Sequence, residues 1–241
     1  MSLTSLMPFV SVTIMFVFAL LVLRRYAVRR GLHLLLWGIG LVMYGIASFT
    51  EAYYTVAGFN DLVFRLWYLF GAMLVAAWLG QGTVYLLVRR RIAGVRIAHV
   101  LMAVLLLGSL YGAFKVFSAQ LDPSLMPGAS LSGHAIVTPG VRILTPFFNI
   151  YGTATLVGGA IYSAFLFWRK RILPHRTVGN ILIAVGALAP AMAGILSRIG
   201  LTEFLYLGEL LGAILMFIGF LQATVEATEP QRQVSQASQL A

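Results

Sequence analysis

Long apolar runs alternate with short polar segments along most of the chain. Seven of these runs are long enough to cross a bilayer as helices, because a span needs about 20 apolar residues. The pattern therefore predicts an all-α fold: a polytopic membrane protein with a seven-transmembrane-helix bundle over residues 1–225 and a polar tail over 226–241, which we expect to be disordered. The expected spans are 6–23, 32–53, 62–88, 97–117, 141–167, 178–197 and 201–224.

Most of the polar connections are short, and one is long. It covers about 118–138, is rich in Pro, Gly and Ser, and has no hydrophobic period. Thr138 and Pro139 stand where a capping residue and a first helical residue are favoured, so we expect them to begin the fifth helix.

The composition agrees with a membrane protein. Of the 241 residues, 60% are hydrophobic and only 10% are charged, whereas soluble domains carry roughly 25% charged residues. The mean hydropathy is +0.92. The chain has no cysteine, which excludes disulfides, thiolate metal sites and cysteine nucleophiles.

The basic residues are concentrated in alternate connections. All but four of the 17 lysines and arginines fall in the first, third and fifth connections or in the tail. By the positive-inside rule this side is cytoplasmic, which predicts an N-out, C-in protein of the plasma membrane, the inner membrane in a bacterium. The net charge of +10 thus reflects topology and contact with membrane lipids, and we expect no nucleic-acid partner.

Polar residues recur at the i, i+4, i+7 spacing of a helix face in several spans. Glu51, Asp61, Glu203 and Glu209 balance the four remaining basic residues in charge. If the polar faces turn inward, they form a nearly neutral pocket open to the outside, above a closed inner half made mostly of Leu, Val, Ala and Phe. The candidate ligand-binding network is Glu209, Arg65, Arg198, Tyr206, Glu51, Asn149, Arg142 and Tyr68.

Glu209 is the deepest of these groups. It lies roughly 12 Å below the outer boundary of a hydrocarbon core about 30 Å thick. An ionised carboxylate there has to be paired, protonated or hydrated. Arg65 and Arg198 are its expected partners, and a structural ion pair and a ligand site both remain open. Glu51 and Arg142 lie closer to the interface, which snorkelling side chains can reach.

No recognised catalytic or cofactor motif is present. Retinal would need a lysine in the seventh helix, but the chain has only Lys115 and Lys170. His33 and His99 lack the pattern of paired haem ligands, and no metal or phosphate-binding motif occurs. We therefore expect a non-enzymatic protein without a cofactor or a metal.

Two stretches, "LLLWGIGLVMYGIASFTEAYY" and "LWYLFGAMLVAAWLGQGTVYLL", resemble the second and third helices of the seven-helix N-terminal sensor region of bacterial histidine kinases. The resemblance also rests on helix number and N-out topology. It implies a sensor for signal transduction that binds an unknown small ligand from outside or within the membrane. No kinase domain follows the last helix here, so signalling would need a separate partner chain.

Other functions compete with the sensor hypothesis. A small transporter is one, although such proteins usually show repeats and broken helices, and only Pro190 in "VGALAPAMAG" hints at the latter. An accessory subunit of a larger membrane complex is another. A membrane-embedded enzyme would have only the Glu and Arg residues in its favour.

Overall fold

A computed structural model describes residues 3–88, 91–92, 95–126, 130–171, 173–198 and 204–224. It confirms seven helical segments long and apolar enough to span a membrane. Glu203, one of the four acids in the charge balance, and the polar tail lie outside these residues. The helices are α1 (Leu3–Arg29), α2 (Leu32–Ala57), α3 (Asp61–Leu66), α4 (Val75–Leu87), α5 (Ile97–Phe117), α6 (Val141–Arg169), α7 (Pro174–Arg198) and α8 (Phe204–Thr224).

The third span, Asp61–Leu87, is one continuous helical segment whose middle part is not a regular α-helix. Between α3 and α4 the backbone forms a π-helix, η1 (Trp67–Leu74). The segment begins after Asn60, whose side chain accepts a hydrogen bond from the Val63 amide at 3.1 Å. Because a π-helix has more residues per turn than an α-helix, the side chains that follow it face a different direction than they would in a regular α-helix. The hydrophobic pattern of residues 62–88 does not reveal this change.

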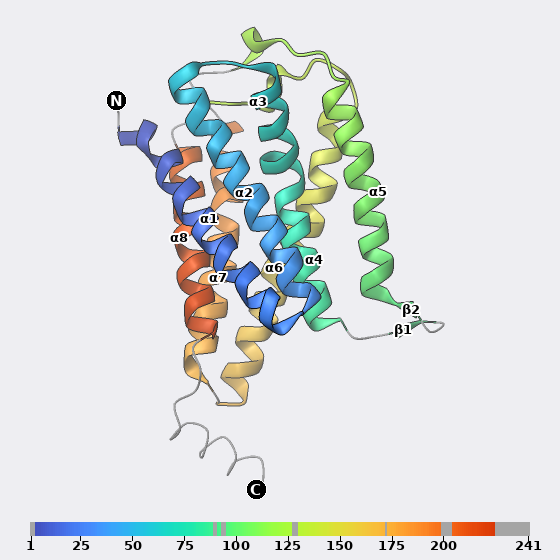
Figure 1. The fold of residues 1–241 in the computed structure, drawn as a ribbon, viewed down its shortest axis with the longest axis vertical. Helices are drawn as coiled ribbons and strands as arrows, with labels where there is room; N and C mark the ends of the chain where they lie inside the picture. Colours follow the sequence, from blue (N-terminus) through green and yellow to red (C-terminus); the bar gives the residue numbers. More distant parts are fainter. Residues whose placement is uncertain are drawn as a thin grey trace, which may run out of the picture.

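Six spans close into a ring. Neighbouring contacts run from α1 to α2, on to η1 and α4, then to α6, α7 and α8, and from α8 back to α1. Figure 1 shows α8 and α7 behind α1 and α2, with α6 behind α4. Helices α2 and α8 both flank α1, so their side chains can meet inside the ring, although more than 140 residues separate them in the chain.

Small residues allow the closest of these contacts. In α6, a Cβ on Gly152 would lie 2.2 Å from the carbonyl carbon of Ala76. In α7, a Cβ on Gly186 would lie 2.8 Å from the Met216 amide of α8, and the Cβ of Gly212 would lie 2.8 Å from the Gly186 carbonyl oxygen. Helices in lipid associate through such small-residue contacts, because no hydrophobic force draws them together.

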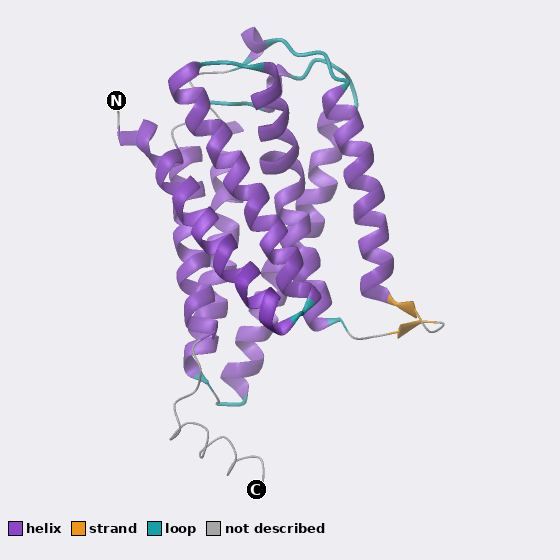
Figure 2. Cartoon of the chain, viewed as in Figure 1, coloured by secondary structure: helices purple, strands orange, loops and turns teal. Residues whose placement is uncertain are grey.

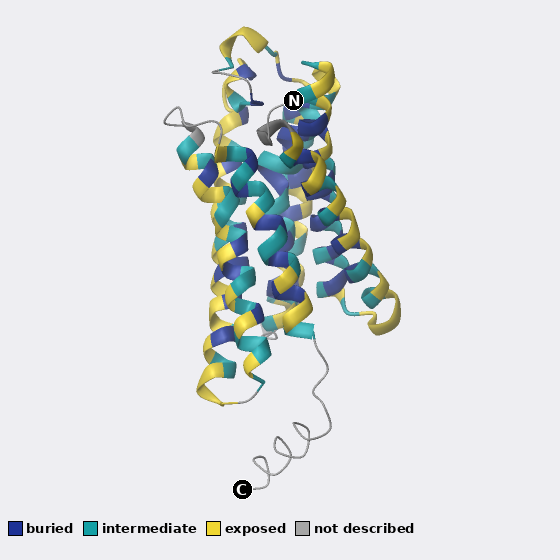
Figure 3. Cartoon of the chain, turned by 90° about the vertical axis from the view of Figure 1, so that its left-hand side faces the viewer, coloured by how far each residue is buried: buried dark blue, intermediate teal, exposed yellow. Residues whose placement is uncertain are grey.

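Helix α5 stands outside the ring. It leans on η1 and the ends of α4 and α6, at the right of Figure 1. Four large apolar side chains along it are more than 60% exposed: Val104, Leu107, Leu110 and Phe114. Figure 3 shows exposed residues along the outward faces of other helices as well. An apolar exterior of this kind suits acyl chains.

The long connection after α5 is folded down onto the bundle. It contains the short helices η2 (Pro123–Leu125) and η3 (Gly133–Ala135), and Leu121 pairs with Ile136. Leu131, Ala135 and Ile136 are buried in the same core cluster as Phe64, Trp67 and Tyr68. The connection therefore covers the end of η1.

Side chains within the long connection hydrogen-bond to its own backbone at two places, Thr138 and Asp122. The expectation that Thr138 and Pro139 begin a helix is wrong, because Thr138 Oγ1 instead accepts from the Gln120 amide at 2.8 Å, and α6 starts at Val141 after Gly140 at φ 82°. At the other bend, hydrogen bonds from the side chain and amide of Ser124 hold the pKa of Asp122 below its ordinary value.

The arginine-rich connections gather at one end of the molecule. They are the α1–α2 turn, the α4–α5 connection with its two short strands β1 (Arg91–Ile92) and β2 (Val95–Arg96), and the α6–α7 turn. Figure 2 shows the two strands at this end, opposite the long connection. We call it the arginine-rich end, and the opposite end the N-terminal end. The N-out orientation stays a prediction from the sequence.

Candidate functional site

Two glutamates from different spans meet inside the N-terminal half of the bundle. Glu51 of α2 is 1% exposed, and Glu209 of α8 is partly buried. Their side chains interact directly. Each lies about 8–9 Å along its helix from the nearer helix end, at 1.5 Å per residue. We call these two residues the carboxyl pair.

The carboxyl pair is tied to the π-helix. Trp67, the first residue of η1, donates its indole N–H to Glu51 Oε1 at 2.7 Å. The other oxygen, Oε2, is buried and has no N–H or O–H donor among the described residues. Since a carboxylate has no proton to donate, a hydrogen bond between Glu51 and Glu209 requires one proton on the pair.

Tyrosines complete the surroundings of the pair. Tyr44 of α2 donates its hydroxyl to the backbone oxygen of Glu209 at 2.9 Å, which links α2 to α8. Tyr206 lies one turn before Glu209, close to both carboxyl groups. Its hydroxyl is buried without a hydrogen-bond partner in the described chain. Tyr54 lies near Tyr206.

Of the two predicted basic partners, Arg65 does not lie beside the carboxyl pair. Among the described side chains, no lysine or arginine interacts with either glutamate. The predicted pairing of Glu209 with Arg65 is wrong in this structure, and the side chain of Arg198 lies outside the described residues. The partner of Glu209 is a second acid. Of the predicted network, the structure brings together Glu51, Tyr206 and Glu209.

Arg65 binds the C-terminal end of α5 instead. Its guanidinium donates to the backbone oxygens of Val116, Phe117 and Ala119, where α5 ends. The last carbonyls of a helix have no partners within it and carry partial negative charge, so a cation there satisfies and stabilises them. Arg65 thus fastens the otherwise loosely held α5 to the third span.

We expect Arg65→Met to destabilise the protein by about 2–3 kcal/mol, because hydrogen bonds to a charged group contribute about 1.5–3 kcal/mol. The measurement is thermal unfolding in detergent, and hydrogen exchange of α5 should show that the loss begins there. Arg142→Met is the matched control, since Arg142 is exposed at the same end of the bundle. Equal losses in the two variants would contradict the capping role.

The other predicted residues lie between η1 and α6. Tyr68 Oη and Thr145 Oγ1 are 2.9 Å apart and buried, and Asn149 Nδ2 donates to the Ala72 oxygen at 3.0 Å. The latter bond satisfies a carbonyl of the π-helix. These contacts join helices, while the side chain of Arg142 is exposed. In the part of the chain that the structure describes, the polar faces therefore separate into two groups.

The inner half, which was expected to be mostly apolar, also contains buried polar contacts. Gln81 of α4 is fully buried, donates to the Ala98 oxygen at 2.8 Å, and accepts from the Tyr151 hydroxyl. Trp37 donates to the Leu79 oxygen at 3.1 Å. A pocket of about 400 Å³ opens at the arginine-rich end. These polar residues are too widely spaced in sequence to form a helical stripe, and only their tertiary contacts reveal them.

The carboxyl pair can hold and release a proton, and a released proton leaves two negative charges side by side in a medium of low dielectric constant. Within the described residues, no group of three or more His, Cys, Asp or Glu side chains comes together. Comparison of the chain with protein-family models, curated proteins and solved structures finds no match.

Proposed function

We propose that this multi-pass membrane protein is a non-enzymatic, sensor-like module whose responsive element is the carboxyl pair and whose ligand is a proton. The observation that carries the proposal is the direct contact of Glu51 and Glu209 without a basic partner among the described side chains. An ionisable group inside a membrane segment is costly and is a functional candidate for that reason.

The contacts of the pair suggest how protonation would reach the rest of the protein. Glu51 holds Trp67 at the start of the π-helix, and Glu209 belongs to the last helix, whose backbone Tyr44 also holds. With one proton shared, the two carboxyl groups bind α2 to α8. Without it they repel each other, which favours a shift of α8 or η1.

The groups that face the pair are few. Tyr44 and Tyr54 come from α2, Tyr206 from α8, and the neutral indole of Trp67 from η1. Helices α1 and α7 also contact α8. Their described titratable side chains lie near the arginine-rich end, at Arg24–Arg29 and at His175 and Arg176. Within the described chain, the two glutamates are therefore the acids that set the response.

The proposal predicts a pH-dependent signal from Trp67. In a variant with the other three tryptophans replaced by phenylalanine, Trp67 emission should follow one titration as the shared proton leaves. Glu51→Gln and Glu209→Gln should each abolish it, because an amide does not titrate, while the indole bond can persist to a glutamine oxygen. The measurement is fluorescence in lipid nanodiscs against pH.

Asp61→Asn provides the control, since Asp61 is exposed at the same end of the bundle and its removal should leave the titration unchanged. A pH-independent signal in the parent, or a titration that survives both glutamine variants, would overturn the proposal. Folding of each variant is checked by size-exclusion chromatography and thermal unfolding, so that loss of the signal is not confused with loss of structure.

A sensor of this kind acts through another protein, as the resemblance to kinase sensor regions also implies. The partner we propose is a separate signalling chain in the same plasma membrane. Crosslinking at α8 in native membranes, compared at low and high pH, would identify a partner whose capture changes with protonation.

A proton-coupled carrier is the second candidate, because it too needs a buried acid that binds and releases protons. One further observation favours it: Pro190 of α7 packs against Gly212 of α8, one turn below Glu209, and a proline in a span frees a backbone carbonyl. Flux measured in proteoliposomes under a proton gradient separates the two. Transport that Glu209→Gln abolishes would favour the carrier over the sensor.

A further inference from the structure

A second site lies at the opposite end of the bundle from the carboxyl pair. The pocket of about 400 Å³ at the arginine-rich end lies between the start of α2, the end of α4 and the start of α5. Its lining residues are Leu32, His33, Tyr85, Leu86, Val88, Arg96 and Ala98. None of them belongs to the network predicted from the polar stripes.

The pocket exists because α5 stands outside the ring. At this end α5 is linked to α4 by the short strands β1 and β2, so the two helices diverge (Figure 2). Gln81 holds the first turn of α5 through the Ala98 oxygen at 2.8 Å. The pocket is therefore bounded by the contact between Gln81 and Ala98, by the start of α2 and by the end of α4.

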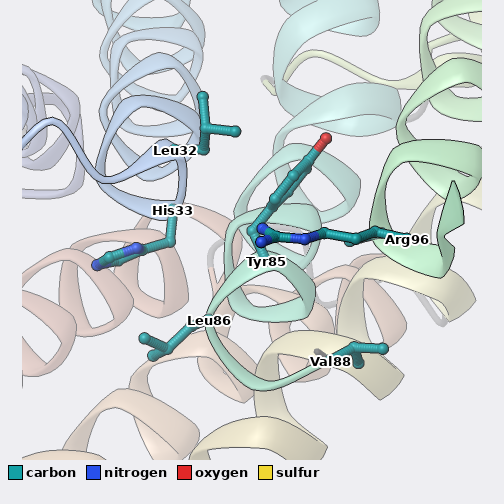
Figure 4. A pocket seen from close by; sticks show the side chains of 7 residues that line it. Leu32, His33, Tyr85, Leu86, Val88 and Arg96 are labelled. Carbon is teal, nitrogen blue, oxygen red and sulfur yellow. The ribbon is translucent and has the colours of Figure 1, made fainter. Parts of the chain in front are cut away.

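The walls are of two kinds. Arg96, Tyr85 and His33 provide a cation, a phenol and an imidazole, and in Figure 4 the Arg96 side chain extends from the start of α5 across toward Tyr85. Leu32, Leu86 and Val88 provide an aliphatic surface, and the first two are 46% and 37% exposed. A ligand that fits both walls has an anionic head and a hydrocarbon part.

The place of the pocket in the fold selects the class of ligand. It lies where three spans end, at the level where headgroups meet acyl chains. Basic pockets between spans at such a level suit phosphate headgroups, and a guanidinium matches phosphate through several N–H donors. We propose that this pocket binds the phosphate headgroup of an anionic membrane lipid, with Arg96 contacting the phosphate and Leu32 and Leu86 contacting an acyl chain.

The site is independent of the proposed proton sensor, since it uses other residues at the other end of the bundle. General attraction of basic loops to an anionic surface would not distinguish Arg96 from the other arginines at this end. One arginine, defined by its place in a pocket, should account for more of the binding than an equally basic residue on the open surface.

Native mass spectrometry and thermal unfolding test the site. The parent protein in phosphatidylcholine is titrated with phosphatidylglycerol, and retained lipid and the rise in melting temperature are measured. Arg96→Gln should weaken binding about tenfold, because a charge-assisted hydrogen bond contributes about 1.5–3 kcal/mol and a factor of ten is 1.4 kcal/mol. Arg169→Gln is the control, since Arg169 is exposed at the same end but does not line the pocket.

A second arm separates a lipid from a free anion. Inorganic phosphate is titrated into the protein in pure phosphatidylcholine, where the proposal expects no saturable stabilisation. Equal losses in the two arginine variants would overturn the pocket and leave only diffuse attraction. Saturable phosphate binding that depends on Arg96 would overturn the lipid assignment. Arg96 is exposed, so its variant should fold, and Arg96→Lys should retain part of the binding.

Discussion

Gly152→Ala should lower the stability of the protein more than any other single methyl group added to α6. The new Cβ would lie 2.2 Å from the carbonyl carbon, 2.4 Å from the oxygen of Ala76 and 2.5 Å from the Ala77 amide. These are backbone atoms of the third span, so no side chain can turn aside to make room. Overpacking typically costs about 1–3 kcal/mol, and here we expect a loss of about 3 kcal/mol or more.

The same helix offers a matched control. At Gly158, the position that an added methyl group would occupy has no heavy atom within 4 Å. Gly158→Ala should therefore be neutral or stabilise the protein by up to about 1 kcal/mol through helix propensity. Thermal unfolding of both variants in the same detergent provides the comparison. Similar melting temperatures for the two would show that α4 and α6 do not approach as closely as described.

Glu51→Ala should produce the second large loss. It removes the acceptor of the Trp67 indole, which is 7% exposed, and leaves a buried N–H without a partner. Such a group costs about 1–3 kcal/mol. The substitution also empties the space beside Glu209. Together we expect a loss of about 3 kcal/mol, measured by unfolding in mild detergent.

Two further variants separate the causes of that loss. Glu51→Gln keeps an oxygen for the indole and should retain most of the stability. Trp67→Phe removes the orphaned donor, so the double variant with Glu51→Ala should lose less than the sum of the single losses, as expected for residues in direct contact. Strict additivity would contradict the hydrogen bond between Glu51 and Trp67.

The spans of this protein could be predicted from the amino-acid sequence because lipid imposes a simple requirement. A segment that crosses the hydrocarbon core must be apolar and must satisfy its own backbone hydrogen bonds. The run around Leu107 and Leu110 meets that requirement even though α5 makes few contacts with the other helices. Helix count and span positions therefore followed from local composition, and the seven spans are confirmed.

The candidate site was predictable only in part. The depth of Glu209 and the stripe that contains Glu51 marked both residues as unusual, since a buried charge is costly wherever it points. Charge balance then suggested arginine partners, and this is where the argument failed for Arg65. A sequence shows which charges exist, but it does not show that an arginine will bind the carbonyl oxygens at the end of a neighbouring helix.

The amino-acid sequence by itself determined that seven helices cross a membrane, where they lie, and which of their polar residues are deep. Tertiary structure alone decided that α2 meets α8, that two acids share one place, that a π-helix presents Trp67 to them, and that the divergence of α5 opens a pocket beside Arg96. The physical reason is range: the hydrophobic requirement acts residue by residue along the chain, whereas the partner of a buried polar group is set by which helices pack together.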